Sequence, residues 1–191
     1  MKVIGITGGT GAGKSSLCEE LKRCGAKIID CDVIARRVVE KGEPALAEIK
    51  KAFGEEVLTD DGELDRKKMG AIVFSQPQKL ECLNSITHKH IFAEMERQMS
   101  ESTENIVVLD VPLLFQSDFP FNCDLTVAVV ADREERISRI MSRDGIDRKT
   151  AEARMANQLT DEEYARLADV CFVNDGGAEK IKCFARELCR M

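Results

Sequence analysis

Several features that define other protein classes are missing from this chain of 191 residues. No apolar run approaches the roughly 20 residues of a membrane-spanning helix. The N-terminus begins with a strand-like segment instead of a charged and then apolar leader. Internal repeats, low-complexity tracts and flexible linkers are also absent from the sequence. We therefore expect a cytoplasmic protein without a membrane partner, folded as one domain with an inserted lobe, since domains average about 150 residues.

Recognisable metal-ligand spacing is missing too. The cysteines lie at positions 18, 24, 31, 82, 123, 171, 183 and 189. They form no C-x-x-C pair, and most of them sit within apolar patterns. We therefore predict small buried residues in a reducing compartment. His88 and His90 form an H-x-H, but the chain has no further histidine to complete a zinc site.

Clustered positive charge is the third absence. The formal net charge is −6, whereas a nucleic-acid surface normally needs a basic patch, so we expect no nucleic-acid partner. A local basic pocket for a small nucleotide remains compatible with this balance. The hydrophobic fraction of 43% and the charged fraction of 32% are typical of a globular protein that buries a core.

What is present is an alternation of strand and helix signals. Nearly continuous apolar runs predict buried strands at 2–7, 26–30, 105–111, 125–131 and 170–174. Helices are predicted between them, one of which covers 33–42. Residues 60–104 contain no convincing strand, and three helices are predicted there, capped by Asp65, begun by Pro77 and begun near Lys89. The pattern predicts an α/β fold with a largely parallel sheet.

Residues 8–16, GGTGAGKSS, carry the strongest motif. They match G-x-x-x-x-G-K-[ST] between a predicted strand and a predicted helix. Backbone amides of such a loop bind phosphate oxygens, and the helix start adds its positive end. The predicted nucleotide-binding residues of the loop are Gly9, Gly11, Ala12, Gly13, Lys14, Ser15 and Ser16. Lys14 would contact the β- and γ-phosphates of ATP, and Ser15 would bind Mg²⁺.

The same loop serves several classes of protein. A GTPase also needs N-K-x-D, and the nearest candidate, VND at 173–175, lacks the lysine. A motor or helicase would need a longer chain and further motifs. A small-molecule kinase needs an acceptor site, a base and cations over the transferred phosphoryl group. Arg136, Arg139 and Arg143 share one helical face, with Arg133 a turn earlier, although interleaved acids leave a solvated helix face as the alternative.

Acidic residues close two of the predicted strands. Asp30 and Asp32, at the end of 26–30, are predicted to point to the same side of the strand. Three uses are open for them: a base toward an acceptor hydroxyl, a cap for the helix from Val33, or a D-x-D metal site. Asp110 closes the strand at 105–111 and is a candidate Mg²⁺ ligand, or simply an acid at a strand end.

Several longer motifs occur in a specific order. They are IGITGGTGAGKSS, IIDCDVIARRVVEKGEPAL, AFG at 52–54, DGELDRKKMGAIVF, LNSITH, VLDVPLLF, RISRIMSRDGIDRKTAEARMANQ and ADVCFVNDGG. Over nearly its whole length the chain thereby resembles the dephospho-CoA kinase family of P-loop kinases. The resemblance implies a three-layer sandwich of nucleotide-kinase type, with a helical insertion near 60–98 for the CoA-like substrate and a lid near 132–160.

The resemblance also implies a reaction and roles. ATP, with Mg²⁺, would phosphorylate the ribose 3′-hydroxyl of dephospho-CoA, giving CoA and ADP. Asp32 corresponds to the base, with Asp30 as support, and Arg139 to the lid arginine that acts with Lys14. The remaining implied contacts are Leu64, Arg66, His88, Pro112 and Leu113 for the acceptor, and Arg143 and Asn174 for ATP.

Two positions depart from the family pattern. Gln116 stands where an acid usually follows P-L-L-F, and Lys89 stands where proline usually follows His88, so that a turn would have to form without proline. Two alternatives stay open: another small-molecule kinase, acting on a nucleoside monophosphate or a polyol, and a nucleotide-binding regulator that transfers nothing. We expect a monomer or a weak homo-oligomer.

Overall fold

The computed structural model describes residues 1–117 and 119–191. The chain divides into two compact units. The first comprises Met1–Asp30 and Ser102–Met191, and the second comprises Cys31–Glu101. Among the described residues, no helix combines the length and the apolar character needed to cross a membrane.

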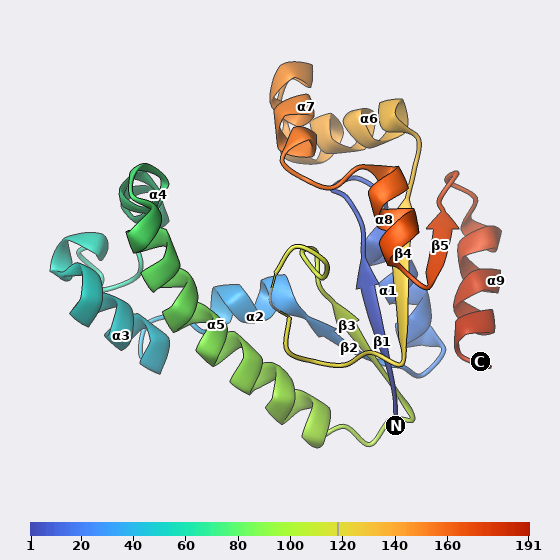
Figure 1. The fold of residues 1–191 in the computed structure, drawn as a ribbon, viewed down its shortest axis with the longest axis horizontal. Helices are drawn as coiled ribbons and strands as arrows, with labels where there is room; N and C mark the ends of the chain where they lie inside the picture. The colour runs from blue at the N-terminus through green and yellow to red at the C-terminus, as the bar shows by residue number, and fades with distance from the viewer. Residues whose placement is uncertain (118) are drawn as a thin grey trace. The chain divides into compact units, whose positions relative to one another are not determined.

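The first unit is built around a parallel sheet (Figure 1). Its elements are β1 (Lys2–Thr7), α1 (Lys14–Arg23), β2 (Lys27–Asp30), β3 (Ile106–Asp110), β4 (Leu125–Val130), α6 (Arg133–Asp144), α7 (Arg148–Ala156), α8 (Asp161–Leu167), β5 (Val170–Val173) and α9 (Ala178–Leu188). All five predicted strands are therefore confirmed. The α/β fold with a parallel sheet is also confirmed.

The strand order β2-β3-β1-β4-β5 brings the predicted functional segments to one edge of the sheet. All the neighbouring strands are parallel, so their carboxyl ends lie together. Asp110 is the register partner of Ile6 in β1 and of Asp30 in β2. The two predicted strand-end acids, Asp30 and Asp110, thus lie side by side, next to the strand that leads into the phosphate loop.

Helices cover both faces of this sheet, as the alternation along β4 demonstrates. Val127 and Val129 belong to a core cluster with residues of α1 and α9. Ala128 and Val130 instead pack with Tyr164 of α8. Because successive strand side chains point to opposite faces, a strand buried on both faces needs an unbroken apolar run. This is the physical basis of the run at 125–130.

The second unit is helical and packs around one long helix (Figure 1). Its elements are α2 (Cys31–Arg37), α3 (Pro44–Phe53), the 3₁₀ turn η1 (Glu55–Val57), α4 (Arg66–Ser75) and α5 (Pro77–Ser100). α2, α3 and α4 each contact α5. Asp65 caps α4 by accepting from the amides of Lys67 and Lys68, as predicted.

Two helix predictions in this unit were wrong. The helix expected over 33–42 begins earlier, at Cys31, and ends at Arg37. The two helices expected from Pro77 and from Lys89 are one continuous helix of 24 residues. Lys89 therefore needs no turn, because a residue with a backbone N–H lets the helix continue where proline would break it.

Candidate active site

The phosphate loop joins β1 to α1 and requires glycine for two reasons. Gly8 and Gly13 have φ angles of 139° and 94°, a region that other residues rarely adopt. A Cβ atom at Gly8 would also collide with the carbonyl oxygen of Val129, and one at Gly13 would collide with the Asn174 amide. The loop can therefore lie close to β4 and to Asn174 only because these positions lack side chains.

The loop ends in the start of α1, where Lys14 is the first helical residue. The Lys14 ammonium donates to the carbonyl of Gly8 at 3.0 Å, which holds its charge over the loop. The amides of Ala12 and Ser16 donate within the loop, to Gly9 and Gly13, at 3.1 Å each. The N-terminus of α1 adds the partial positive charge that favours an anion.

Three arginines of α6, which the sequence placed on one helical face, contact this loop. Arg136 is buried, donates from Nε to the Thr10 carbonyl at 3.0 Å, and pairs with Asp161 of α8 at 2.7 Å. Burial raises the pKa of Asp161 even though the Arg136 charge acts in the opposite direction. Arg136 therefore fastens α6 and α8 to the loop, a structural role that the sequence pattern did not distinguish.

Arg139 and Arg143 lie further along the same face. Arg139 donates to the Gly11 carbonyl at 3.2 Å and pairs with Glu135 at 2.6 Å. Arg143 reaches the Thr10 hydroxyl at 3.4 Å and pairs with Asp144 at 2.7 Å. Both side chains thus reach the tip of the phosphate loop, and an entirely solvated arginine face is excluded.

Arg133 does not belong to this group, which corrects its expected position on the same side of α6. Its guanidinium pairs instead with Glu134 at 3.3 Å and with Glu152 of α7 at 3.2 Å. A further loop contact was missed from the sequence: the Gln158 side chain accepts from the Thr10 amide at 2.7 Å. Gln158 follows α7, so the segment predicted as a lid touches the loop at both of its ends.

Asn174, which directly follows β5, also contacts the phosphate loop. Its side-chain amide donates to the Ala12 carbonyl at 2.8 Å, and its oxygen accepts from the Gly176 amide at 3.1 Å. The residue is buried directly after β5, where its own amide donates to the Val130 carbonyl at 2.8 Å. Asn174 therefore joins the end of β5 to the phosphate loop.

Ser15, Asp30 and Asp110 line one hollow of about 270 Å³ at the edge of the sheet. Cys18 of α1 lies there as well, and its sulfur contacts a carboxylate oxygen of Asp110 at 3.6 Å. Burial first, and the Asp110 charge second, raise the pKa of the Cys18 thiol far above its usual range. The residues predicted to bind Mg²⁺ are thus brought together with Asp30.

The donor types of this hollow fit Mg²⁺, which prefers oxygen ligands and is commonly held by one or two carboxylates together with substrate phosphates. A cluster of three or more His, Cys, Asp or Glu side chains suited to a metal ion is absent from residues 1–117 and 119–191. The donors present are the Ser15 hydroxyl and the carboxylates of Asp110 and Asp30.

Asp32 is exposed in the first turn of α2, two residues after the end of β2. The expected strand alternation with Asp30 was wrong, because the strand ends at Asp30 and the helix begins at Cys31. Asp32 also does not precede its helix, which excludes the predicted role as the cap of a helix from Val33. A carboxylate in the first helical turn is still favoured by the helix dipole.

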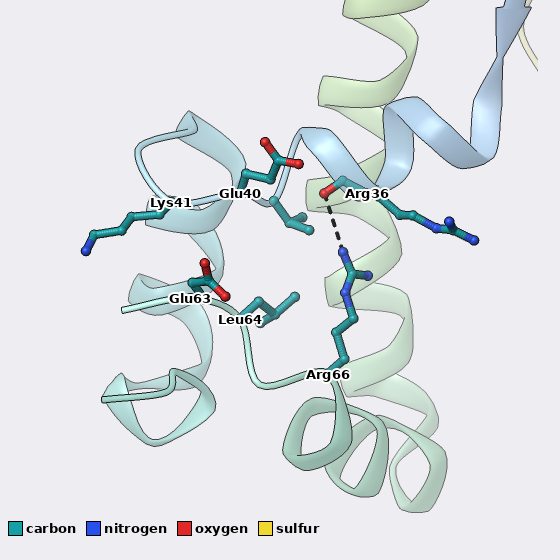
Figure 2. A pocket seen from close by; sticks show the side chains of 7 residues that line it. Arg36, Glu40, Lys41, Glu63, Leu64 and Arg66 are labelled. Carbon is teal, nitrogen blue, oxygen red and sulfur yellow. Dashed lines mark hydrogen bonds between the residues drawn. The ribbon is translucent and has the colours of Figure 1, made fainter. Parts of the chain in front are cut away.

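A second hollow, of about 380 Å³, lies within the helical unit (Figure 2). Glu63 and Leu64, which precede α4, and Arg66, its first residue, line the hollow. Arg36, Glu40 and Lys41, from the end of α2 and the turn that follows, also line it. Arg66 donates to the carbonyl of Arg36 at 3.4 Å. The sequence predicted Leu64 and Arg66, whereas only the fold reveals that Arg36 and Lys41 lie beside them.

The other predicted acceptor residues lie on separate elements. His88 is exposed on α5 and its ring packs against Phe92, with centroids 5.4 Å apart. Pro112 follows β3, and its carbonyl accepts from the Thr7 hydroxyl at 3.0 Å. Leu113 is 49% exposed, and Gln116 is exposed in the same turn.

The prediction that the cysteines are mostly buried was wrong. Only Cys18 is fully buried, and all eight are free thiols. Four are exposed, namely Cys24, Cys82, Cys171 and Cys183. Their apolar sequence neighbours misled the prediction, because a helix or an edge strand can bury one side chain and expose the next.

A parallel sheet, a glycine loop with lysine and serine at the start of a helix, and a helical arginine face on that loop define a P-loop kinase. Residues 2–180 match the model of the dephospho-CoA kinase family, CoaE. The chain belongs to this family and is a kinase that uses ATP.

Curated relatives have similar lengths. A dephospho-CoA kinase of Leifsonia xyli is 42% identical over 184 residues, covering 94% of this chain and 93% of the relative. One from Bacillus cereus is 41% identical over 177 residues, covering 91% and 88%.

Solved structures share the fold. TT1252 from Thermus thermophilus matches with a TM-score of 0.88 at 30% identity, covering 100% of this chain and 97% of that one. A dephospho-CoA kinase from Campylobacter jejuni matches with a TM-score of 0.70 at 27% identity, covering 100% and 96%. A shikimate kinase from Acinetobacter baumannii, at 14% identity and a TM-score of 0.57, covers 100% and 92% and shares the fold.

Proposed function

We propose that this kinase transfers the γ-phosphoryl group of ATP to the ribose 3′-hydroxyl of dephospho-CoA, giving CoA and ADP. The observation that carries the proposal is the family match over residues 2–180, which includes both the phosphate loop and the helical unit with its hollow. Such a reaction needs a phosphate cradle, cations over the transferred group, an acceptor site and a base.

The phosphate cradle is assigned to the loop at the end of β1. Backbone amides of Gly9, Gly11 and Gly13 and the hydroxyl of Ser16 would face the phosphates, as the N-terminus of α1 favours. Lys14, already held over the loop by Gly8, would contact the β- and γ-phosphates.

The cations over the γ-phosphate are assigned to α6. Arg139 and Arg143 reach the tip of the loop and would neutralise the charge that develops during transfer. Their present partners are loop oxygens and neighbouring acids, which phosphate oxygens would replace when ATP binds. Asn174, which holds the loop through the Ala12 carbonyl, is proposed to lie beside the adenine of ATP.

Ser15 and Asp110 are the proposed Mg²⁺ ligands, with Asp30 beside them. When bound, Mg²⁺ neutralises phosphate charge and orients the β- and γ-phosphates. This chain contributes one hydroxyl and one carboxylate, and Asp30 adds negative charge that favours a cation in the hollow.

The acceptor is assigned to the helical unit. Dephospho-CoA carries a diphosphate, and Arg36, Lys41 and Arg66 of this hollow are the cations proposed to bind it, beside the lining acids Glu40 and Glu63. Leu64 adds an apolar contact in the same hollow. His88, Pro112 and Leu113 are proposed as further acceptor contacts.

The base is assigned to Asp32, the exposed acid of α2. Its carboxylate would accept the proton of the ribose 3′-hydroxyl as that oxygen attacks the γ-phosphorus. The bond to the β-γ bridging oxygen breaks, and ADP leaves with the electron pair of that bond.

The direct test incubates the protein with Mg-ATP and dephospho-CoA and measures CoA by mass spectrometry. We expect stoichiometric CoA and ADP. If the protein phosphorylates a nucleoside monophosphate or a polyol and forms no CoA, dephospho-CoA is not its acceptor. ATP binding with no transfer to any of these acceptors would identify a regulator and overturn the proposal.

A further inference from the structure

Thr10, at the tip of the phosphate loop, is held by three side chains from the segment that follows β4. Its amide donates to Oε1 of Gln158 at 2.7 Å, and its carbonyl accepts from Nε of Arg136 at 3.0 Å. Its hydroxyl lies 3.4 Å from a guanidinium nitrogen of Arg143. The approach is close, because a Cβ atom at Gly9 would collide with the Arg136 guanidinium. The reaction as assigned so far gives Gln158 no role.

The backbone that carries Gln158 is itself held in place between α7 and α8. Its amide donates to the Met155 carbonyl at 3.1 Å. The next residue, Leu159, packs against Tyr164 in the core beneath α8. Thr160 then begins α8 with a capping box. Gln158 therefore reaches the loop from an ordered segment.

Gln158 and Arg136 act on two successive peptide groups of the loop. In a planar trans peptide the N–H and the C=O point in opposite directions. Gln158 holds the N–H of Thr10, so the Gly9 carbonyl of the same peptide points the other way, where it accepts a loop amide at 3.1 Å. Arg136 holds the carbonyl of Thr10, so the Gly11 N–H of that peptide points away from the guanidinium.

We propose that Gln158 is a positioning residue for phosphoryl transfer, because it fixes the Thr10 amide and thereby the direction of the Gly11 amide toward the terminal phosphate of ATP. This role rests on the proposed function. Arg139, the cation assigned to the γ-phosphate, donates to the Gly11 carbonyl at 3.2 Å, so Gly11 lies at the γ-phosphate end of the loop. Without Gln158 the peptide before Thr10 can rotate, and a misdirected donor no longer stabilises charge that develops during transfer.

An uncharged acceptor suits this position. A carboxylate would also accept from the Thr10 amide, but its negative charge would repel the phosphates of ATP. Gln158→Glu therefore keeps the acceptor and changes the charge, whereas Gln158→Leu removes the acceptor and leaves the charge unchanged. We expect kcat to fall about tenfold in Gln158→Leu. In Gln158→Glu we expect kcat within about threefold of the unmodified protein and a higher KM for ATP.

The test measures CoA formation at varied Mg-ATP in the full chain, together with Tm and the hydrogen exchange of the Thr10 amide by NMR. We expect this amide to exchange about tenfold faster in Gln158→Leu and to stay protected in Gln158→Glu. Asn157→Leu is the matched control, since this neighbouring exposed amide donates to Ala153 of its own helix. It should change neither kcat nor the exchange of the Thr10 amide.

The proposal is overturned by an unchanged kcat in Gln158→Leu, by an equal fall in Gln158→Glu, or by an equal fall in Asn157→Leu. A fall in Tm large enough to unfold Gln158→Leu at the assay temperature would show a structural role and would overturn it as well. If the unmodified protein forms no CoA, the proposed acceptor fails. The exchange of the Thr10 amide, which needs no acceptor, then decides whether Gln158 positions the loop, and equal rates in Gln158→Leu and the unmodified protein would exclude it.

Discussion

Asn174 donates a hydrogen bond to the carbonyl of Ala12 at 2.8 Å, which joins the end of β5 to the phosphate loop across the sheet. Gly13 packs against the same side-chain amide, and a Cβ atom at that position would collide with it. Asn174 is buried and also binds the Gly176 amide, so its position is determined by two backbone groups. The shape of the phosphate loop therefore depends on a residue near the other end of the chain.

Asn174→Ala should loosen this loop. We expect about tenfold weaker ATP binding, equivalent to about 1.4 kcal/mol, because the Ala12 carbonyl loses the donor that holds it. The free energy of unfolding should fall by about 1–3 kcal/mol, since buried backbone groups lose their partners. Isothermal titration and urea unfolding measure the two effects. Lys180→Ala, which removes the exposed ion-pair partner of Asp175, is the control and should change neither.

Arg139→Ala should separate transition-state stabilisation from nucleotide binding. We expect kcat to fall about 10²-fold or more, with a smaller change in the KM for ATP, because charge at the γ-phosphate develops mainly during transfer. Steady-state kinetics with varied ATP measures both constants. Arg133→Ala on the same helix is the control, since Arg133 pairs with Glu152 instead of contacting the loop. Equal losses in the two variants would contradict a specific role for Arg139.

Asp32→Asn should retain ATP binding and lose turnover. A general base contributes about 10²–10⁴-fold to a rate, and we expect a fall in kcat of this size. The measurements are kcat and the dissociation constant for ATP, both in the Asp32→Asn variant. Asp60→Asn changes another exposed acid of the helical unit and should behave like the unmodified protein. If kcat of Asp32→Asn stayed the same, another group would have to accept the proton.

Arg66→Ala should weaken the acceptor and spare ATP. Loss of a charge-assisted hydrogen bond is worth about 1.5–3 kcal/mol, so we expect the KM for dephospho-CoA to rise about 10–100-fold. The KM for ATP should be unchanged. Lys67→Ala removes the next cation along the chain, which does not line the hollow, and serves as the control. An equal rise for both variants would indicate a general charge effect instead of a site.

Glu94 should make the helical unit sensitive to acid. Its carboxylate binds Arg97 of α5 and also pairs with Arg37 of α2. Chiefly through the Arg97 hydrogen bond, the pKa of Glu94 falls from 4.5 to about 2. A carboxylate with a lowered folded pKa stabilises the fold above its unfolded pKa, and this stabilisation is lost as pH falls from about 4.5 toward 2.

Glu94→Gln is the corresponding test. After allowance for solvent screening we expect a loss of about 1–2 kcal/mol at pH 7 and a smaller pH dependence below pH 4.5. Urea unfolding at several pH values measures both effects. Glu96→Gln, an exposed acid of the same helix, should leave the pH dependence as it was. A Glu94→Gln profile parallel to that of the unmodified protein would show that other groups dominate.

Local patterns in the sequence were sufficient for the strands, the phosphate loop and the family. Buried parallel strands such as 125–130 need apolar residues on both faces, and that requirement is visible in one short run. The loop is equally local, because its glycines, Lys14 and Ser15 are consecutive. The spacing of Arg136, Arg139 and Arg143 also predicted a shared face, since helical periodicity depends on the sequence alone.

The tertiary structure decided what those side chains touch. Arg136 is buried and pairs with Asp161, so it joins α6 to α8. Arg139, on the same face of α6, instead donates to the Gly11 carbonyl at the tip of the phosphate loop. Arg36 and Lys41 join Leu64 and Arg66 only because the turn after α2 folds beside the start of α4. The exposure of the cysteines likewise depends on how whole helices and strands pack. Contacts between distant segments carry no local pattern, because they are set by the packing of whole elements.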